Sequence, residues 1–433
     1  MTYSRMAKAF AARLLPAGEI FSDHSISIFP IVDVDPLNLL ALLNSAPVAD
    51  LLRTMGRGRA TENSAVKALP ISPVEVAAMG SSADQVRSIL AILWARAARD
   101  ETSRTFHWPY PTARAVTVED IVAREALELE VIDRAQRHLD ERAAAIMNTQ
   151  GDWSELAVKR RAMLTDADVS PVRIAGRILS YLIGVALGQW DPAHGHAGPP
   201  ETSSMLQPLP ATPPAARVPG SFGPAERYVL ADDQGRPGDL IAALHAAAHQ
   251  VGNDANKTVA DLEAVVGPLR TWFRGKFFRY HLEQYSQFRR RAPIYWYLSV
   301  PSGDWGLWVS ATALSRELLY SLARLARDKE AVQGNLVELL TNETLQTPQA
   351  GRTRLGVRLE AAERLLSELR IFRAEAERIA SIGWDPDLAD GIPLCAAPLA
   401  SIFPAWADAA DHRDRLKSGE FKWANVSKWA DSL

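Results

Sequence analysis

The chain has 433 residues, enough for two or three domains with sizeable cores. Its 47% hydrophobic and 23% charged residues are an ordinary soluble composition with a formal net charge of −3. The single cysteine, Cys395, excludes an intramolecular disulfide and a cysteine-cluster metal site, and a reducing, cytoplasmic setting fits it best. The longest apolar run, residues 178–187, is too short to span a bilayer, and no signal peptide is indicated.

Residues 1–75 predict a small mixed module. Short β-like runs such as 26–32 accompany a helix-like stretch, 37–52, which Pro36 can start at its first turn. A loop rich in glycine and arginine follows. Because glycine removes side-chain bulk and arginine supplies forked donors, this loop can approach phosphates closely. Its candidate binding residues are Arg57, Arg59, Asn63 and Lys67. The alternative is a flexible surface loop with incidental charges.

The middle of the chain, residues 76–195, predicts a helical region. A period of 3.6 residues indicates helices at 73–97, 118–147 and 171–190. Ser170 is a plausible cap for the third of them. Gly184 and Gly188, four residues apart on that helix, would let another helix pack closely against it.

A Pro-rich linker, residues 196–237, separates the helical region from a helical C-terminal domain, residues 238–433. Eight prolines among the 26 residues from 199 to 224 exclude regular structure there. In the C-terminal domain, residues 239–249 and 257–273 predict helices that lead into a basic segment.

The basic segment, residues 270–291, carries seven Lys or Arg side chains and one acid, Glu283. On a helix, Phe277, Tyr280 and Phe288 share one face and are expected in the core, whereas cations project from another face. The candidate cationic residues are Arg274, Lys276, Arg279, Arg289, Arg290 and Arg291. A partner with negative charge is predicted. The alternative is a solvated helix face beside a core hairpin.

Pro293 ends the predicted basic helix, because the residue before a proline is pushed out of the α region. Residues 294–300 and 305–310 then predict a β-hairpin, with Tyr295 and Trp296 in the core.

Long helical patterns follow the hairpin. Residues 309–345 continue as a helix, and apolar residues from 355 to 379 recur every three or four positions as in a coiled-coil seam. The tail, residues 384–433, is expected to be rich in loops. Three tryptophans are expected to hold the tail to the body, namely Trp406, Trp423 and Trp429.

Several of these segments carry a family resemblance. A basic run ending in Arg-Arg-Ala-Pro-Ile-Tyr-Trp, then a Ser-x-Pro-Ser-Gly turn and a Trp-containing strand, resembles the C-terminal half of PglX-type adenine-specific DNA methyltransferases. These enzymes belong to BREX phage-defence systems and are related to single-chain restriction-modification enzymes. Further segments that resemble the family in order are residues 10–30, 39–70, 178–191, 390–399 and 419–423.

The resemblance implies a target-recognition role in binding double-stranded DNA. The basic segment is then expected to contact phosphates, while Arg57, Arg59 and Asn63 lie nearer to base edges. The family's catalytic half needs a Gly-rich S-adenosylmethionine loop and an Asn-Pro-Pro-Tyr-type motif that holds a flipped adenine, and the sequence contains neither. We therefore expect no cofactor in this chain, no methylation by it alone, and a separately encoded catalytic subunit or other defence-system proteins as partners.

Two other classes of function stay open. One is a helical protein-interaction scaffold of a defence complex that uses the basic helix and the seam at 355–379 without touching DNA. The other is an enzyme whose chemistry the motifs do not identify. For all three, the dominance of helical periodicity predicts a mostly helical α+β fold.

Overall fold

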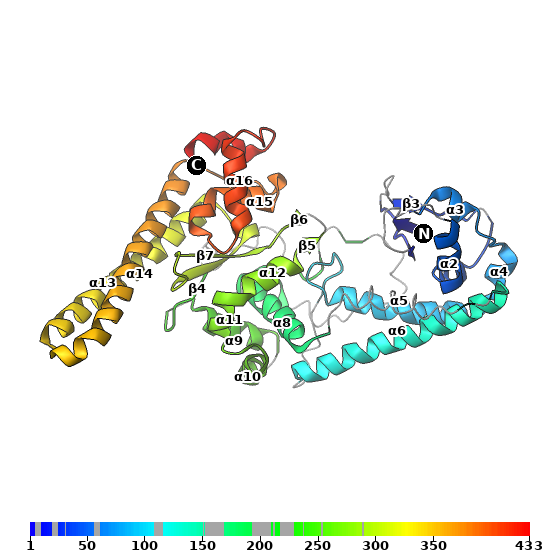
Figure 1. The fold of residues 1–433 in the computed structure, drawn as a ribbon, viewed down its shortest axis with the longest axis horizontal. Coiled ribbons are helices and arrows are strands. Elements are labelled where there is room, and N and C mark those ends of the chain that lie inside the picture. Colours follow the sequence, from blue (N-terminus) through cyan, green and yellow to red (C-terminus); the bar gives the residue numbers. More distant parts are fainter. Residues whose placement is uncertain are drawn as a thin grey trace. The chain divides into compact units, whose positions relative to one another are not determined.

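The structure, a computed structural model, describes residues 1–4, 10–19, 25–30, 32–55, 61–107, 116–149, 151, 169–192, 209–210, 213–216, 229–236, 238–252, 254–287 and 290–433. Helices dominate these residues, and short strands form two three-stranded sheets and one two-stranded sheet (Figure 1). The predicted mostly helical α+β fold is confirmed. Within these ranges no single helix is long and apolar enough to cross a membrane; only the bent pair Ile392–Ile402 and Ala407–Lys417, at 102°, passes that test when taken together.

The chain divides into two compact units. The first comprises Met1–Pro111, Val116–Ile174 and His194–Ala215, and the second comprises Thr112–Ala115, Ala175–Ala193 and Ala216–Leu433. The boundaries expected from the sequence at residues 75, 195 and 237 stay predictions.

The first unit begins with an antiparallel sheet of order β2-β1-β3. Its strands are β1 (Thr2–Ser4), β2 (Ala12–Arg13) and β3 (Ser25–Ser27). The side chain of Asn44 accepts a hydrogen bond from the Ala12 amide (2.8 Å) and donates one to the Ala12 carbonyl (2.9 Å). The edge strand β2 is thereby attached to the end of the first helix.

The helices of this unit are α1 (Pro36–Leu43), α2 (Ala46–Met55), α3 (Asn63–Lys67), α4 (Pro73–Ala78), α5 (Ser82–Ala98) and α6 (Val118–Ile146). The helix predicted at 118–147 is confirmed. Two stretches expected as continuous helices are broken. Residues 37–52 break at Asn44, whose side chain binds the strand, and residues 73–97 break at Gly80, whose φ of 53° ends α4.

The second unit is centred on a buried antiparallel sheet of order β4-β8-β7. Its strands are β4 (Val229–Ala231), β7 (Tyr295–Ser299) and β8 (Gly306–Ser310), and every residue in them is buried. The predicted hairpin is confirmed, with Trp296 opposite Val309 and Tyr297 opposite Trp308. Tyr295 and Trp296 are fully buried, as expected from the sequence.

Short helices precede this hairpin in the second unit. They are α8 (Pro171–Ala186, which starts in the first unit), α9 (Leu240–Gln250), α10 (Ala255–Val266), α11 (Leu269–Trp272), the π-helical turn η4 (Phe273–Phe277) and α12 (Phe278–Gln284). A two-stranded ribbon, β5 (Ser286–Gln287) and β6 (Arg290–Arg291), joins them to β7.

The expected pairing of α8 with another helix across its two glycines is wrong. A side chain at Gly184 would overlap Tyr295 and Trp190, so two aromatic rings, not a helix, occupy the space that this glycine leaves. Gly188 has a φ of 75° and lies beyond the helix end at Ala186.

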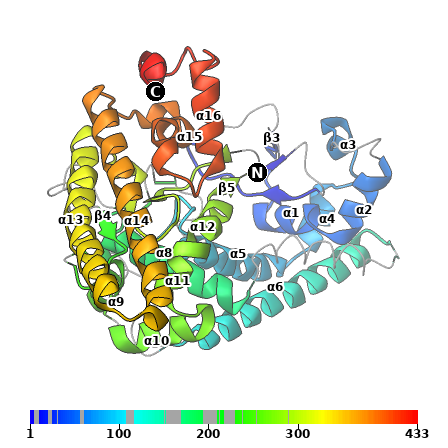
Figure 2. The same cartoon turned by 60° about the vertical axis from the view of Figure 1, so that its left-hand side comes forward.

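Two long helices, α13 (Arg316–Gln346) and α14 (Gln349–Ser381), lie side by side as an antiparallel hairpin in both ribbon views (Figures 1 and 2). The helix predicted from residue 309 begins only at Arg316. Residues before it belong to β8 and to the 3-10 turn η5 (Ala311–Ala313), and Ser315 caps α13 by accepting from the Leu318 amide (3.1 Å). Residues of the predicted seam, among them Leu369 and Ile379, are buried.

The tail is more helical than the sequence predicted. It forms η6 (Leu388–Asp390), α15 (Ile392–Ala396), η7 (Ala397–Ile402), α16 (Ala407–Lys417) and η8 (Asn425–Ser432). Trp406 is buried as expected and Trp429 is half-buried, but Trp423 is 70% exposed and does not hold the tail to the body. Cys395 is buried in α15, and its thiol lies 3.1 Å from the Asp387 carbonyl oxygen.

Candidate nucleic-acid interface

The basic segment is not one helix. After Gln284 the chain turns into the ribbon β5–β6, in which Ser286 pairs with Arg291. The prediction that the basic helix runs to residue 291 is therefore wrong, because the helix ends at Gln284. The hydroxyl of Ser286 donates to the Leu282 carbonyl (2.5 Å) and satisfies one of the carbonyls left open at the helix end. The cations at either end of the segment therefore lie on different elements.

Arg270 and Arg274 bind acids inside the second unit. The carboxylate of Asp232, which has no exposed side-chain surface, accepts from Arg270 Nη1 (2.5 Å) and from Arg274 Nε. Arg270 also donates through Nη2 to Asp239 (2.7 Å), whose other oxygen caps α9 at the Ala242 amide. Burial lowers the pKa of Arg270, but the hydrogen bonds to Asp239 and Asp232 outweigh it and the pKa is raised. The two arginines thus join the end of β4, the start of α9 and the α11–η4 turn.

Lys276 and Arg279 are exposed cations, and neither forms an ion pair with a described residue outside its own helical stretch. Lys276 makes no ion pair with any part of the chain that the structure describes. Arg279 has 85% of its side chain exposed and lies 3.5 Å from Glu283, one turn further along the helix. Because exposed pairs of this kind contribute little, Arg279 can exchange Glu283 for an anionic partner at small cost.

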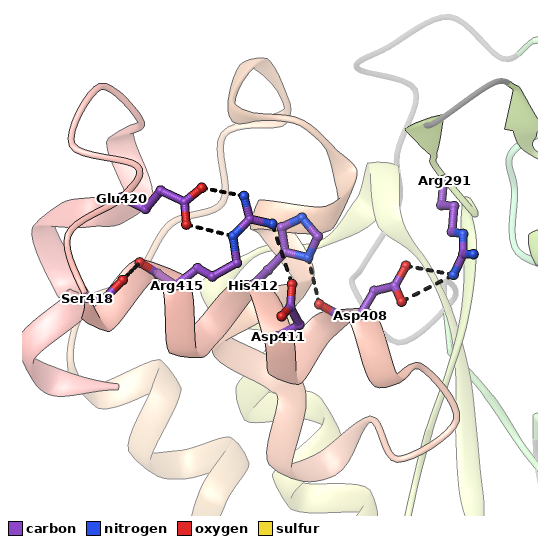
Figure 3. A network of polar contacts seen from close by, with 7 residues as sticks. All are labelled: Arg291, Asp408, Asp411, His412, Arg415, Ser418 and Glu420. Carbon is purple, nitrogen blue, oxygen red and sulfur yellow. Dashed lines mark hydrogen bonds and ion pairs between the residues drawn. The ribbon is translucent and has the colours of Figure 1, made fainter.

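Arg291 belongs to a polar network on α16 (Figure 3). Its Nη1 donates to both carboxylate oxygens of Asp408 (3.2 and 3.1 Å). One turn later, His412 donates from Nδ1 to the Asp408 carbonyl (2.6 Å), and Arg415 binds both oxygens of Glu420 (2.7 and 2.5 Å). The ribbon β5–β6 is thereby attached to the tail, and Arg291 has an acidic partner within the chain.

The remaining predicted binding residues are distributed between described and undescribed parts. Arg57, Arg59 and Arg289, as well as the core candidate Phe288, lie outside the described residues, and only the backbone of Arg290 is described. Asn63 and Lys67 begin and end the short helix α3 in the first unit, and both are exposed. Of the other expected core residues, Phe277 is fully buried and Tyr280 is half-buried.

A buried histidine lies behind the basic segment. His281 is fully buried, and its Nε2 accepts hydrogen bonds from the amides of Ile294 (3.0 Å) and Tyr295 (3.1 Å). Burial lowers the pKa of His281 to about 3, so the ring is neutral, and Nδ1 carries the proton toward Ser180 Oγ at 3.4 Å. This geometry holds the start of β7 against α12 and α8, and it is a structural role.

A basic and aromatic loop in the tail was missed by the sequence reasoning. The side chain of Phe421 lies between the Arg415 guanidinium (4.7 Å) and the His412 ring (5.9 Å). On the other side of the loop, the carboxylate of Asp390 accepts from the amides of Asn425 and Val426, both at 2.8 Å. Between these two attachments the chain exposes Trp423, with its neighbour Lys422 also exposed. The sequence shows this surface only as the pair Lys422-Trp423 in a polar stretch, and the expectation that Trp423 holds the tail to the body pointed the other way.

Comparisons with known proteins leave the resemblance as an expectation from the sequence. No protein-family model matches the chain, and a search of the curated proteins finds no match. Among the described residues, no three His, Cys, Asp or Glu side chains come together as a metal site.

Proposed function

We propose that this chain is the DNA-recognition part of an N6-adenine-specific DNA methyltransferase of a phage-defence or restriction-modification system, acting in the cytoplasm. Methyl transfer and S-adenosylmethionine binding are assigned to a catalytic domain outside this sequence, since the sequence has no adenine-clamp motif and no cofactor loop. Double-stranded DNA is the proposed ligand.

The observation that supports this proposal is that those resembling segments that lie in the second unit meet in one core. Ser180 of the 178–191 segment contacts His281, and Gly184 of the same segment packs on Tyr295. The Trp296 ring packs against Phe403 in a tilted arrangement, with 5.5 Å between ring centroids, just beyond the 390–399 segment. The Asp390 carboxylate binds the backbone immediately after the 419–423 segment. The resembling segments of the second unit, which occur in the family's order in the sequence, thus also pack together, while residues 10–30 and 39–70 belong to the first unit.

The exposed cations Lys276 and Arg279 are the proposed phosphate contacts of this body. Arg270 and Arg274 are excluded from that role because they neutralise buried acids. Trp423 and Lys422 present an aromatic ring beside a cation, a combination suited to a phosphate contact and to stacking on a base that has left the duplex. Arg291 joins them only when DNA displaces Asp408.

The test is the salt dependence of duplex DNA binding by the purified chain, measured by fluorescence anisotropy. In the variant Lys276→Ala/Arg279→Ala, the loss of two phosphate contacts should reduce the slope of log affinity against log salt by about two units. A matched control, Lys257→Ala/Arg370→Ala, removes two other exposed cations, from α10 and α14, that form no ion pair with a described residue. Equal slopes for the wild type and the first variant would contradict the assignment, and equal losses in both variants would indicate unspecific charge effects.

The scaffold alternative loses one of its two predicted surfaces and keeps the exposed cations of the basic segment. The seam at 355–379 packs against α13, with Leu369 and Ala376 fully buried, and is not available to another protein. A chain that bound no duplex DNA at low salt would nevertheless favour a scaffold role.

A further inference from the structure

The outer half of the α13–α14 hairpin is separate from the rest of the second unit. Between its inner half and other elements there are ion pairs such as Lys329–Asp233 (2.7 Å) and Arg364–Asp304 (3.5 Å). Beyond Glu330 on α13 and before Arg364 on α14, the hydrogen bonds of the described residues stay within the hairpin. Its apolar cluster there is small, with Leu340, Leu355 and Ala362 at its centre and Val337 and Leu359 beside them.

This outer half exposes apolar side chains along one flank of α13. Val332, Leu336 and Leu339 are 58%, 39% and 67% exposed. Their spacing of four and three residues places them in one row along the helix. The row lies beside the face that packs on α14, because Gln333, Val337 and Leu340 each follow a member of it by one position.

A second row on α14 lies on the same flank. Val357 is 65% exposed, and Ala361 and Leu365 follow it at four-residue spacing and are half-buried. Gln333 Nε2 donates to the Ala362 carbonyl (3.1 Å), which fixes the contact positions of the two helices. The row on α13 and Ala361 in the row on α14 precede contact residues of their helices by one position, and in an antiparallel pair of right-handed helices such positions turn toward the same side. The two rows therefore form one apolar flank.

The charges along the hairpin are divided between its helices. Residues 331–346 of α13 contain Glu338 and Glu343 and no Lys or Arg. Residues 349–364 of α14 contain four arginines, at positions 352, 354, 358 and 364, and two glutamates, at positions 360 and 363. Glu343, Arg354 and Arg358 form no ion pair with any described residue, since only Arg364 has one among these side chains. An acidic helix and a basic helix thus border the same apolar flank.

We propose that this flank binds a second copy of the chain. The two hairpins pack flank to flank and point the same way about a two-fold axis parallel to them, so that each α13 faces the partner's α14 in a four-helix bundle. All neighbouring helices are then antiparallel, the two apolar rows cover one another, and Glu343 of each copy faces Arg354 of the other. A parallel stack of α13 on α13 would instead bring acid to acid, which the charge pattern disfavours.

Sedimentation velocity of the full chain over a wide concentration range tests the proposal. The wild type should dimerise reversibly, and Leu336→Lys/Leu339→Lys should weaken the dimer by roughly a hundredfold or more because two core positions become charged. The matched control Ile371→Lys changes a residue that is 62% exposed on the same helix pair but away from the flank, and it should dimerise as the wild type does. A wild type that stays monomeric throughout, or a double variant that dimerises normally, overturns the proposal.

Charge reversal gives a second test that does not depend on the leucines. Glu343→Arg or Arg354→Glu alone should weaken dimerisation by roughly fivefold, whereas both changes in one chain should restore it, because the two positions meet across the axis. Circular dichroism checks that every variant is folded. No rescue in the double reversal contradicts the α13-to-α14 arrangement.

Discussion

The sheet core of the second unit and the outer half of its helical hairpin use charged and polar side chains in opposite ways. Around β4 and β7, Asp232 and His281 are buried and bound to groups from other elements. In the outer hairpin, Glu343 and Arg354 face solvent and have no ion pair among the described residues. Three of the seven cations of the basic segment, Arg270, Arg274 and Arg291, therefore bind acids of other elements, and the charges available for binding lie partly elsewhere. The number of Lys and Arg residues in a stretch of sequence therefore does not show how many of those side chains are free to bind a partner.

Removing one acid from each region tests this difference most directly. Asp232→Ala should lower the free energy of unfolding by about 2–3 kcal/mol, because Arg270 and Arg274 each lose a charge-assisted hydrogen bond to a buried carboxylate. Glu338→Ala in the hairpin should change it by less than about 0.5 kcal/mol. Urea unfolding of both variants measures the difference, and similar costs would mean that the Asp232 cluster does not act as a structural joint.

A second expected effect is a pH dependence that originates at His281. Its pKa is about 3 in the folded chain and about 6.5 when unfolded, so between these values only the unfolded chain binds the proton. The free energy of unfolding should therefore fall as pH decreases from 6.5, by about 2 kcal/mol at pH 5. Comparing wild type with His281→Gln cancels the carboxylate contributions that both share. Parallel pH profiles for the two proteins would show that the histidine is not held neutral.

The smallest pair of effects compares two glycines in helices. Gly184→Ala should destabilise by about 1–3 kcal/mol, because the new methyl group would overlap Tyr295 and Trp190. Gly334→Ala in α13 meets no atom within 4 Å and should stabilise by about 0.5–1 kcal/mol through helix propensity. Thermal unfolding of both variants should show shifts of opposite sign. A stabilising Gly184→Ala would mean that the core around β7 can accommodate extra volume.

Regular features of the second unit were predictable because they depend on neighbours in sequence. Residues 294–300 and 305–310 are apolar strands around a Pro-Ser-Gly-Asp turn, and the hairpin formed as expected. The seam at 355–379 correctly indicated a helix pair. Boundaries were less predictable, since a hydroxyl such as Ser286 or a capping residue such as Ser315 decides them after tertiary contacts are made.

The binding surface was less predictable than the fold. Nothing local in Arg270 or Arg274 indicates that Asp232, about forty residues earlier in the chain, pairs with both of them. Likewise, tryptophan is usually a buried residue type. Trp423 is exposed because its loop is held on one side by the bond from Arg415 to Glu420 and on the other by the bond from the Asn425 amide to Asp390. Such pairings depend on the fold, and a single sequence does not encode them as a local pattern.

The buried thiol of Cys395 is a natural probe of how often the tail opens. Burial, with added repulsion from Asp390 and Asp387, raises its pKa to about 12, so the folded chain presents almost no thiolate. Because the sequence has no other cysteine, a disulfide reagent can label the protein only when α15 leaves its packing. The labelling rate then reports how often this region opens under native conditions, and a fluorophore attached after opening marks a single defined position without any engineered residue.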